Sequence, residues 1–172
     1  NLPPEIGQLR ALRELHLSNS HLTSLPPEIG QLTALRALPL NNNQLTSLPP
    51  EIGQLVALDQ LILDNNQLTI LPPEIGKLIS TSWINLNDNK LTALPVQIGQ
   101  LSALRGLYLK NNRLTTLPRE ITRLKSLERL FLHGNEALGI PLSVLGPTWD
   151  ESLNNRANTA SPRAVLDYYF AR

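Results

Sequence analysis

Hydrophobic positions along the chain recur with a fixed period of 23 residues. In the copy that spans residues 48–70, with the sequence LPPEIGQLVALDQLILDNNQLTI, the core positions are Leu48, Ile52, Leu55, Leu58, Leu61, Leu63 and Leu68. Copies begin, without any insertion, at Leu2, Leu25, Leu48, Leu71, Leu94 and Leu117. Across the six copies 41 of 42 such positions are apolar, and the exception is Thr81. One copy cannot bury seven large side chains alone, so the pattern predicts coils that stack on their neighbours.

Each copy contains two short predicted elements. Leu61 and Leu63 flank Ile62, and this alternation predicts a short extended segment with the leucines on the core face. The segment 50–55, with the sequence PEIGQL, is too short and too rich in Pro and Gly for a long helix. We expect one turn of 3₁₀ or α-helix there, on the outer side of the coil.

An asparagine follows the predicted strand at a fixed distance in all copies but the first. It recurs in five of the six copies as Asn43, Asn66, Asn89, Asn112 and Asn135, and Ser20 takes its place in the first copy. An amide side chain can both donate to and accept from backbone groups, and unpaired backbone groups inside a coil are costly. We therefore interpret these residues as structural, and Asn89 in the run 85–89 as a turn residue instead of a calcium ligand.

The motif LxxLxLxxNxL, present as Leu58, Leu61, Leu63, Asn66 and Leu68, resembles the leucine-rich repeat family over residues 2–139. The LPxEI form of the repeat is similar to the cytosolic, signalling-associated class of that family. The resemblance implies an α/β repeat solenoid shaped as a horseshoe. A parallel β-sheet would line its concave face, short 3₁₀ or α turns its convex face, and the recurrent asparagines would form a ladder.

The first two copies depart from the pattern. The first copy lacks a polar cap, so we expect a partly bare edge formed by Leu2, Leu12, Leu15 and Leu17. The second copy places Pro39 within its strand, where proline cannot donate a ladder hydrogen bond and should leave a neighbouring carbonyl unpaired.

Residues 140–172 break the period, and we expect six repeats in 1–139 followed by a C-terminal cap and linker helix in 140–172. Ser161 and Pro162 are typical of a helix start, and they predict a short helix over 164–172. Gly146, Pro147 and the stretch 154–162 are typical of loops. The apolar residues expected to cover the sixth repeat are Leu142, Leu145, Trp149, Leu153, Val165 and Leu166.

The outward strand residues define a candidate binding surface. Neighbouring strands lie about 4.8 Å apart, so Tyr108 and Phe131 should lie side by side, with Trp83 one strand away on the diagonal. Exposed aromatics flanked by cations resemble a protein-binding hot spot. The candidate residues are Trp83, Tyr108, Phe131, Arg105, Lys110, Arg129, His133 and Ile62. The alternative is that the aromatics only pack on one another and stiffen the sheet.

Composition narrows the function classes. The net charge of +1 does not suggest a nucleic-acid partner. The chain has no cysteine, which excludes disulfide caps, thiolate metal sites and cysteine nucleophiles. No P-loop, HExxH or GxSxG motif is present, so we expect no catalytic residue, cofactor or metal in this chain. No signal peptide or membrane span is evident, and we expect a piece of a larger cytoplasmic protein.

The tail carries a second resemblance. Ile140-Pro141, Trp149 and the stretch 164–170, with the sequence AVLDYYF, resemble the segment that leaves the repeats of bacterial Roco proteins. That resemblance implies the non-catalytic N-terminal recognition arm of a GTPase. The concave face would bind a protein or a neighbouring domain, and the full-length protein could dimerise through domains outside this chain. Two alternatives stay open: a free-standing scaffold or effector, and the recognition domain of a repeat-containing enzyme such as a ubiquitin ligase.

Overall fold

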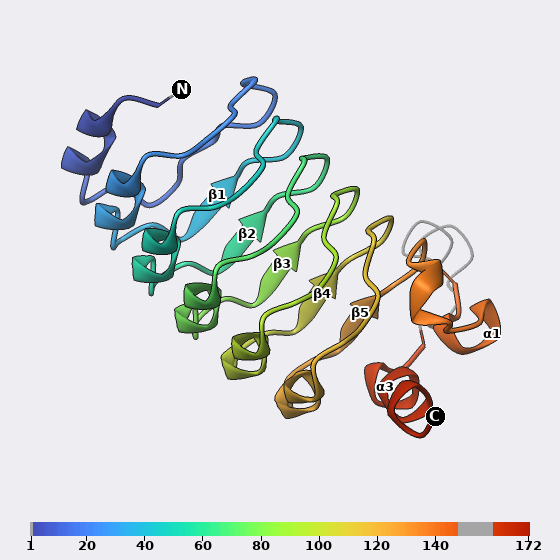
Figure 1. Ribbon diagram of the computed structural model, residues 1–172. Coiled ribbons are helices and arrows are strands. Elements are labelled where there is room, and N and C mark those ends of the chain that lie inside the picture. Colours follow the sequence, from blue (N-terminus) through green and yellow to red (C-terminus); the bar gives the residue numbers. More distant parts are fainter. Residues whose placement is uncertain (1, 148–159) are drawn as a thin grey trace.

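The computed structural model describes residues 2–147 and 160–172, and it shows a stack of coils that advance in one direction from the N-terminus to the C-terminus (Figure 1). Each coil from the second to the sixth contributes one strand to a single sheet, and all six coils contribute one helical turn to the opposite side. The predicted solenoid is confirmed. In the described ranges no helix combines the length and the apolar character needed to cross a bilayer.

Five short parallel strands form the sheet in sequence order: β1 (Ala37–Pro39), β2 (Gln60–Ile62), β3 (Trp83–Asn85), β4 (Gly106–Tyr108) and β5 (Arg129–Phe131). Every pair keeps the 23-residue register, so Leu38 lies opposite Leu61, and Leu61 opposite Ile84. Equivalent residues of successive coils therefore form straight rows across the sheet.

The first coil contributes only an isolated bridge between Glu14 and Ala37. The repeat pattern predicts a strand at the equivalent positions of this coil, and the structure has none there. Pro39 accounts for part of this difference, because it has no N–H to extend pairing toward the first coil. Its carbonyl still accepts a hydrogen bond from the Leu17 amide at 2.9 Å. The edge formed by Leu2, Leu12, Leu15 and Leu17 is only partly buried, as expected.

The convex side carries one 3₁₀ helix per coil. These helices are η1 (Pro4–Gln8), η2 (Pro27–Gln31), η3 (Pro50–Gln54), η4 (Pro73–Lys77), η5 (Val96–Gln100) and η6 (Arg119–Arg123). A recurring glycine lets each helix approach the next: a Cβ on Gly53 would lie 2.5 Å from the carbonyl oxygen of Glu74. The sixth coil has Thr122 at this position, and among the described residues no further 3₁₀ helix of this row packs beyond η6.

The leucine and isoleucine columns form one continuous core. Most of these side chains in the second to sixth coils are fully buried, including Ile52, Leu55 and Leu58. Burial of one such side chain is worth about 1.5–3 kcal/mol, so the core is the main source of stability. Thr81 is also fully buried, and its hydroxyl donates to the Leu58 carbonyl at 2.7 Å, which satisfies the polar group.

The asparagine ladder is confirmed. Asn66 donates to the carbonyls of Leu40 and Leu63 at 3.0 and 3.1 Å and accepts from the Leu45 amide at 3.0 Å, so it ties its own coil to the preceding one. Asn89 makes the same set of bonds one coil later. The residue before the ladder position has positive φ in all six coils, and these residues are Asn19, Asn42, Asn65, Asp88, Asn111 and Gly134. Asn, Asp and Gly tolerate this conformation best.

The described part of the tail folds onto the sixth coil. It contains η7 (Glu136–Leu138), α1 (Leu142–Leu145) and α3 (Pro162–Phe170), and both α-helices lie at the C-terminal end of the stack (Figure 1). Leu145, Val165 and Leu166 join the core, as predicted.

Three details of the predicted tail differ or lie outside the described residues. Leu142 is 72% exposed, so its predicted role in the cap is wrong. Ser161 occupies the N-cap position of α3 but makes no side-chain capping bond. Trp149 and Leu153 lie outside the described residues.

Candidate functional site

Trp83 is the centre of the outward face of the sheet. Gly106 occupies the adjacent position on β4, and a Cβ there would collide with the Trp83 ring. The indole therefore covers the backbone of β4. Arg129 lies on β5, beyond Gly106, and its guanidinium carbon is 5.5 Å from the centre of the Trp83 ring, which is a cation–π distance. Three successive strands thus build one platform, and Trp83 stays partly exposed on it.

The next row extends the platform with stacked rings. The Tyr108 ring centre lies 6.2 Å from that of Trp83 and 5.3 Å from that of Phe131, and the planes of Tyr108 and Phe131 differ by 13°. The predicted side-by-side arrangement, with Trp83 on the diagonal, is confirmed. Tyr108 is partly exposed like Trp83, so these two rings are the accessible part of the aromatic cluster.

Two predicted contact residues are buried, and the expectation that they are exposed is wrong. Phe131 is 3% exposed and His133 is 6% exposed. The Phe131 face is covered by the Tyr108 ring, and Nε2 of His133 lies 2.8 Å from the Gly146 carbonyl oxygen in the segment that follows α1. The sixth coil therefore uses this part of its concave face to hold the tail.

A polar network borders the aromatic platform on the side of the third coil. Asn85 donates to Oδ1 of Asp64 at 3.0 Å and accepts from the Asn87 amide at 3.1 Å. The Oδ1 atom of Asn87 in turn accepts from the Lys110 amide at 2.8 Å. Burial raises the pKa of Asp64 above its ordinary value of 3.8, and its own backbone and Asn65 act in the opposite direction. These side chains are oriented by one another, so the network is preorganised.

The other predicted residues lie around the platform. Arg105 is exposed and its guanidinium lies 3.7 Å from the Glu128 carboxylate, while Ile62 is partly buried on β2. Gly106 is a site residue that the sequence pattern did not predict, although it is the only glycine in a column that otherwise carries side chains. The ordered pair of Asp64 and Asn85 was not predicted from the sequence either. Over the described ranges, no group of three or more His, Cys, Asp or Glu side chains is placed to hold a metal ion.

Stacked coils, one open parallel sheet, 3₁₀ turns and an asparagine ladder define a repeat solenoid of the leucine-rich type. The family comparison agrees, because the model described as "Leucine-rich repeat region" matches residues 3–82 and the model described as "Leucine rich repeat" matches residues 79–136. The chain belongs to the leucine-rich repeat family. Comparison with curated protein sequences gives no match.

Solved structures supply further relatives. A leucine-rich repeat protein of Leptospira interrogans is 44% identical with a TM-score of 0.76, and the match covers 91% of this chain and 37% of that chain. The ectodomain of the receptor kinase GASSHO1/SCHENGEN3 from Arabidopsis thaliana, solved in complex with CASPARIAN STRIP INTEGRITY FACTOR 2, is 42% identical with a TM-score of 0.71. That match covers 77% of this chain and 17% of the ectodomain chain.

The leucine-rich repeat domain of the type III effector XopL is 28% identical with a TM-score of 0.71, and the match covers 79% of this chain and 49% of that chain. The present chain thus spans less than half the length of each of these three relatives.

Proposed function

We propose that the chain is a non-catalytic recognition module that binds a protein segment across β2–β5, with Trp83 and Tyr108 as the principal contacts. The observation that carries the proposal is the Trp83 platform, in which an accessible indole is held over Gly106 and against Arg129. Aromatic residues fixed in place lose little entropy on binding, and they dominate the energetics of many interfaces. The GASSHO1/SCHENGEN3 relative, solved in complex with its protein partner, supports this class of function.

The surroundings of the platform suggest how a partner would be oriented. The polar network of Asp64, Asn85 and Asn87 offers fixed hydrogen-bonding groups on one side. Ile62 offers an apolar neighbour on β2. Lys110 adjoins the polar network through its amide bond to Asn87, and the pair of Arg105 and Glu128 supplies charged groups before β4 and β5. A central aromatic contact with a polar rim is the usual anatomy of a protein interface.

An affinity-capture experiment tests this assignment. The chain is immobilised, and partners retained by the wild type are quantified against those retained by Trp83→Ala and Tyr108→Ala. Loss of a central aromatic contact costs about 2 kcal/mol, equivalent to about a thirtyfold weaker Kd. Ile79→Ala is the matched control, because Ile79 is 54% exposed on the convex side. Equal retention by wild type and both concave-face variants would contradict the proposal.

The more specific assignment is the N-terminal recognition arm of a Roco-type GTPase. It rests on the resemblance of Ile140-Pro141 and of the paired tyrosines, Tyr168 and Tyr169, to the repeat-to-GTPase junction. The anchoring of α3 supports a junction role, because the Tyr169 hydroxyl accepts a hydrogen bond from the Leu117 amide at 3.1 Å and so couples the helix to the sixth coil. This assignment predicts that the gene continues beyond the Arg172 codon into a strand and a GxxxxGK[ST] loop.

The alternative is a free-standing effector, which the likeness to the XopL repeat domain favours. Reading the gene beyond the Arg172 codon separates the two assignments. A stop codon shortly after Arg172 would exclude the GTPase arm and leave the recognition role of the concave face intact.

A further inference from the structure

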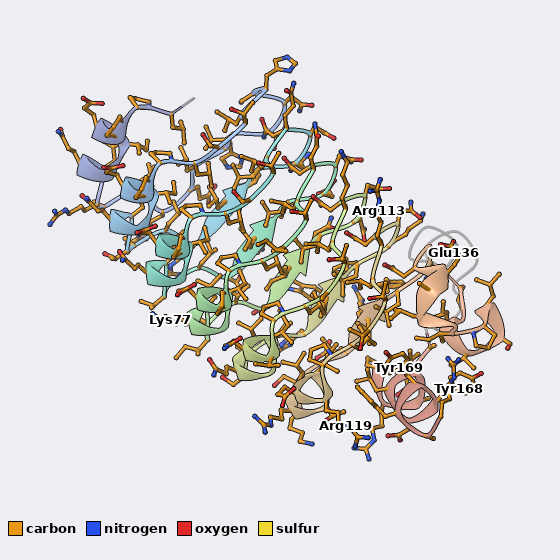
Figure 2. The ribbon with its side chains drawn as sticks, viewed as in Figure 1. Lys77, Arg113, Arg119, Glu136, Tyr168 and Tyr169 are labelled. Carbon is orange, nitrogen blue, oxygen red and sulfur yellow. The ribbon has the colours of Figure 1, made fainter. Side chains whose placement is uncertain are left out.

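A polar hollow of about 470 Å³ lies between the loop that opens the sixth coil and helix α3, outside the concave face. The side chains that give it its chemistry are Thr115, Thr116, Arg119, Tyr169 and Arg172. Figure 2 shows Arg119 and Tyr169 near each other at the junction of the sixth coil and α3. The hollow is shallow and largely open to solvent, so a ligand could enter without any movement of the backbone.

Two guanidinium groups border this hollow. Nη1 of Arg172 donates to the carbonyls of Leu138 and Gly139 at 3.0 and 2.8 Å, which fixes the orientation of the group. Guanidinium has five N–H donors in a planar fork, so the remaining donors of Arg172 are available at a defined angle. The guanidinium carbon of Arg119 lies 5.8 Å from the centre of the Phe170 ring, which restricts that side chain in turn.

Within residues 2–147 and 160–172, no carboxylate forms an ion pair with Arg119 or Arg172. Asp167 is paired with Arg163 at 2.9 Å, and the backbone and Cβ of Glu120 pack against Gly99 of the preceding coil. Glu136 lies toward the other end of the cap, away from Arg119, in Figure 2. The two positive charges are therefore uncompensated around one hollow.

Hydroxyl groups complete the arrangement. The Tyr169 hydroxyl accepts from the Leu117 amide at 3.1 Å and lies 3.5 Å from Oγ1 of Thr116, to which it can donate. Thr116 then keeps its own proton for a ligand. Two arginines and a hydroxyl donor match a tetrahedral oxyanion, which arginine binds through paired, charge-assisted hydrogen bonds.

We propose that the hollow between the sixth coil and α3 binds a phosphoryl group, either as free phosphate or as a phosphate monoester. Its volume exceeds that of a phosphate ion, so it leaves space beside the Tyr169 and Phe170 rings for the esterified group. Because the hollow joins the sixth coil to the cap, an anion there holds α3 on the repeats.

Titration of the ¹⁵N-labelled chain, followed by amide chemical shifts, tests this assignment. Inorganic phosphate and phenyl phosphate are added separately, and sodium chloride at equal ionic strength is the reference. Saturable shifts are expected at Leu117, Leu138 and the end of α3. A lower Kd for phenyl phosphate identifies the monoester as the ligand class, and an equal or higher Kd identifies the free anion.

Arg119→Gln should weaken phosphate binding at least tenfold. Arg113→Gln removes the same charge from an exposed site on a different side of the stack (Figure 2) and should leave the Kd unchanged. Thermal melting of both variants verifies that each is folded. The proposal is overturned if neither ligand gives saturable shifts in the wild type, or if both variants weaken binding equally.

Discussion

Removal of one ladder side chain from the middle of the stack, Asn66→Ala, has a cost that can be worked out bond by bond. The substitution deletes the acceptor of the Leu45 amide and the donor to the carbonyls of Leu40 and Leu63, together with a long contact of 3.4 Å to the Asp64 carbonyl. The Leu40 and Leu63 carbonyls are not orphaned, because Asn43 also donates to Leu40 and Asn89 also donates to Leu63. The Leu45 amide has no second acceptor in the ladder.

The main loss is thus one buried N–H left without a partner, which costs about 1–3 kcal/mol, with smaller losses from the two weakened carbonyl contacts. We expect the free energy of unfolding to fall by about 2–3 kcal/mol. Urea denaturation followed by far-ultraviolet circular dichroism measures this difference. Gln44→Ala is the control, because it deletes an amide of similar chemistry from an exposed site in the second coil.

Substitutions at exposed sites of this kind usually change stability by less than about 0.5 kcal/mol. If Asn66→Ala and Gln44→Ala gave the same small change, the ladder would not carry the stability assigned to it. A loss of stability larger than expected for Asn66→Ala is also informative. A loss well above 3 kcal/mol would show that the two carbonyls depend on Asn66 more than their second donors suggest.

Three further outcomes are expected. Gly106→Ala should lower the free energy of unfolding by about 1–3 kcal/mol in the wild type, because its Cβ meets the Trp83 ring. The loss should be much smaller in a Trp83→Ala background, and additive losses in the double-mutant cycle would contradict the contact. Burial raises the pKa of Asp64 above 3.8, so its contribution to stability is complete below pH 3.8 and falls as the pH rises through the folded-state pKa. Asp64→Asn should therefore unfold at a higher urea concentration than wild type at pH 7 and at the same concentration near pH 3, and a difference that persisted at pH 3 would refute the linkage. Tyr169→Phe deletes the bond to the Leu117 amide and should speed hydrogen exchange of that amide without altering exchange in β1–β4.

The fold follows from sequence because the period specifies it directly. A 23-residue unit with seven apolar positions has one good way to bury them, and the same register then applies to every coil. The role of the ladder asparagines is equally local, since each occupies a fixed position after its strand. The preceding residue could have been recognised too: the pairs Asn42-Asn43, Asn65-Asn66 and Asp88-Asn89 combine a left-handed position with a ladder position.

The details of the candidate site depend on contacts that no period encodes. Burial of His133 involves Gly146, which belongs to the aperiodic tail, so its exposure could not be judged from the repeat alone. Trp83 was correctly placed on the outward face, but its direction along that face depends on the empty space over Gly106. Leu142 shows the converse case, in which an apolar residue in the tail remains in solvent.

The recognition platform depends on the uniform length of three coils. Trp83, Gly106 and Arg129 come from β3, β4 and β5, and they are neighbours because each coil returns the chain to the same row after 23 residues. Because inward and outward residues alternate along each strand, a one-residue slip of β4 would move Leu107 out of its leucine column and Gly106 out of the outward row together. Since the leucine columns dominate stability, a residue inserted in the ladder turn between β3 and β4 would be looped out there, and both rows would keep their register. The leucine register that builds the core therefore also holds the three platform residues side by side.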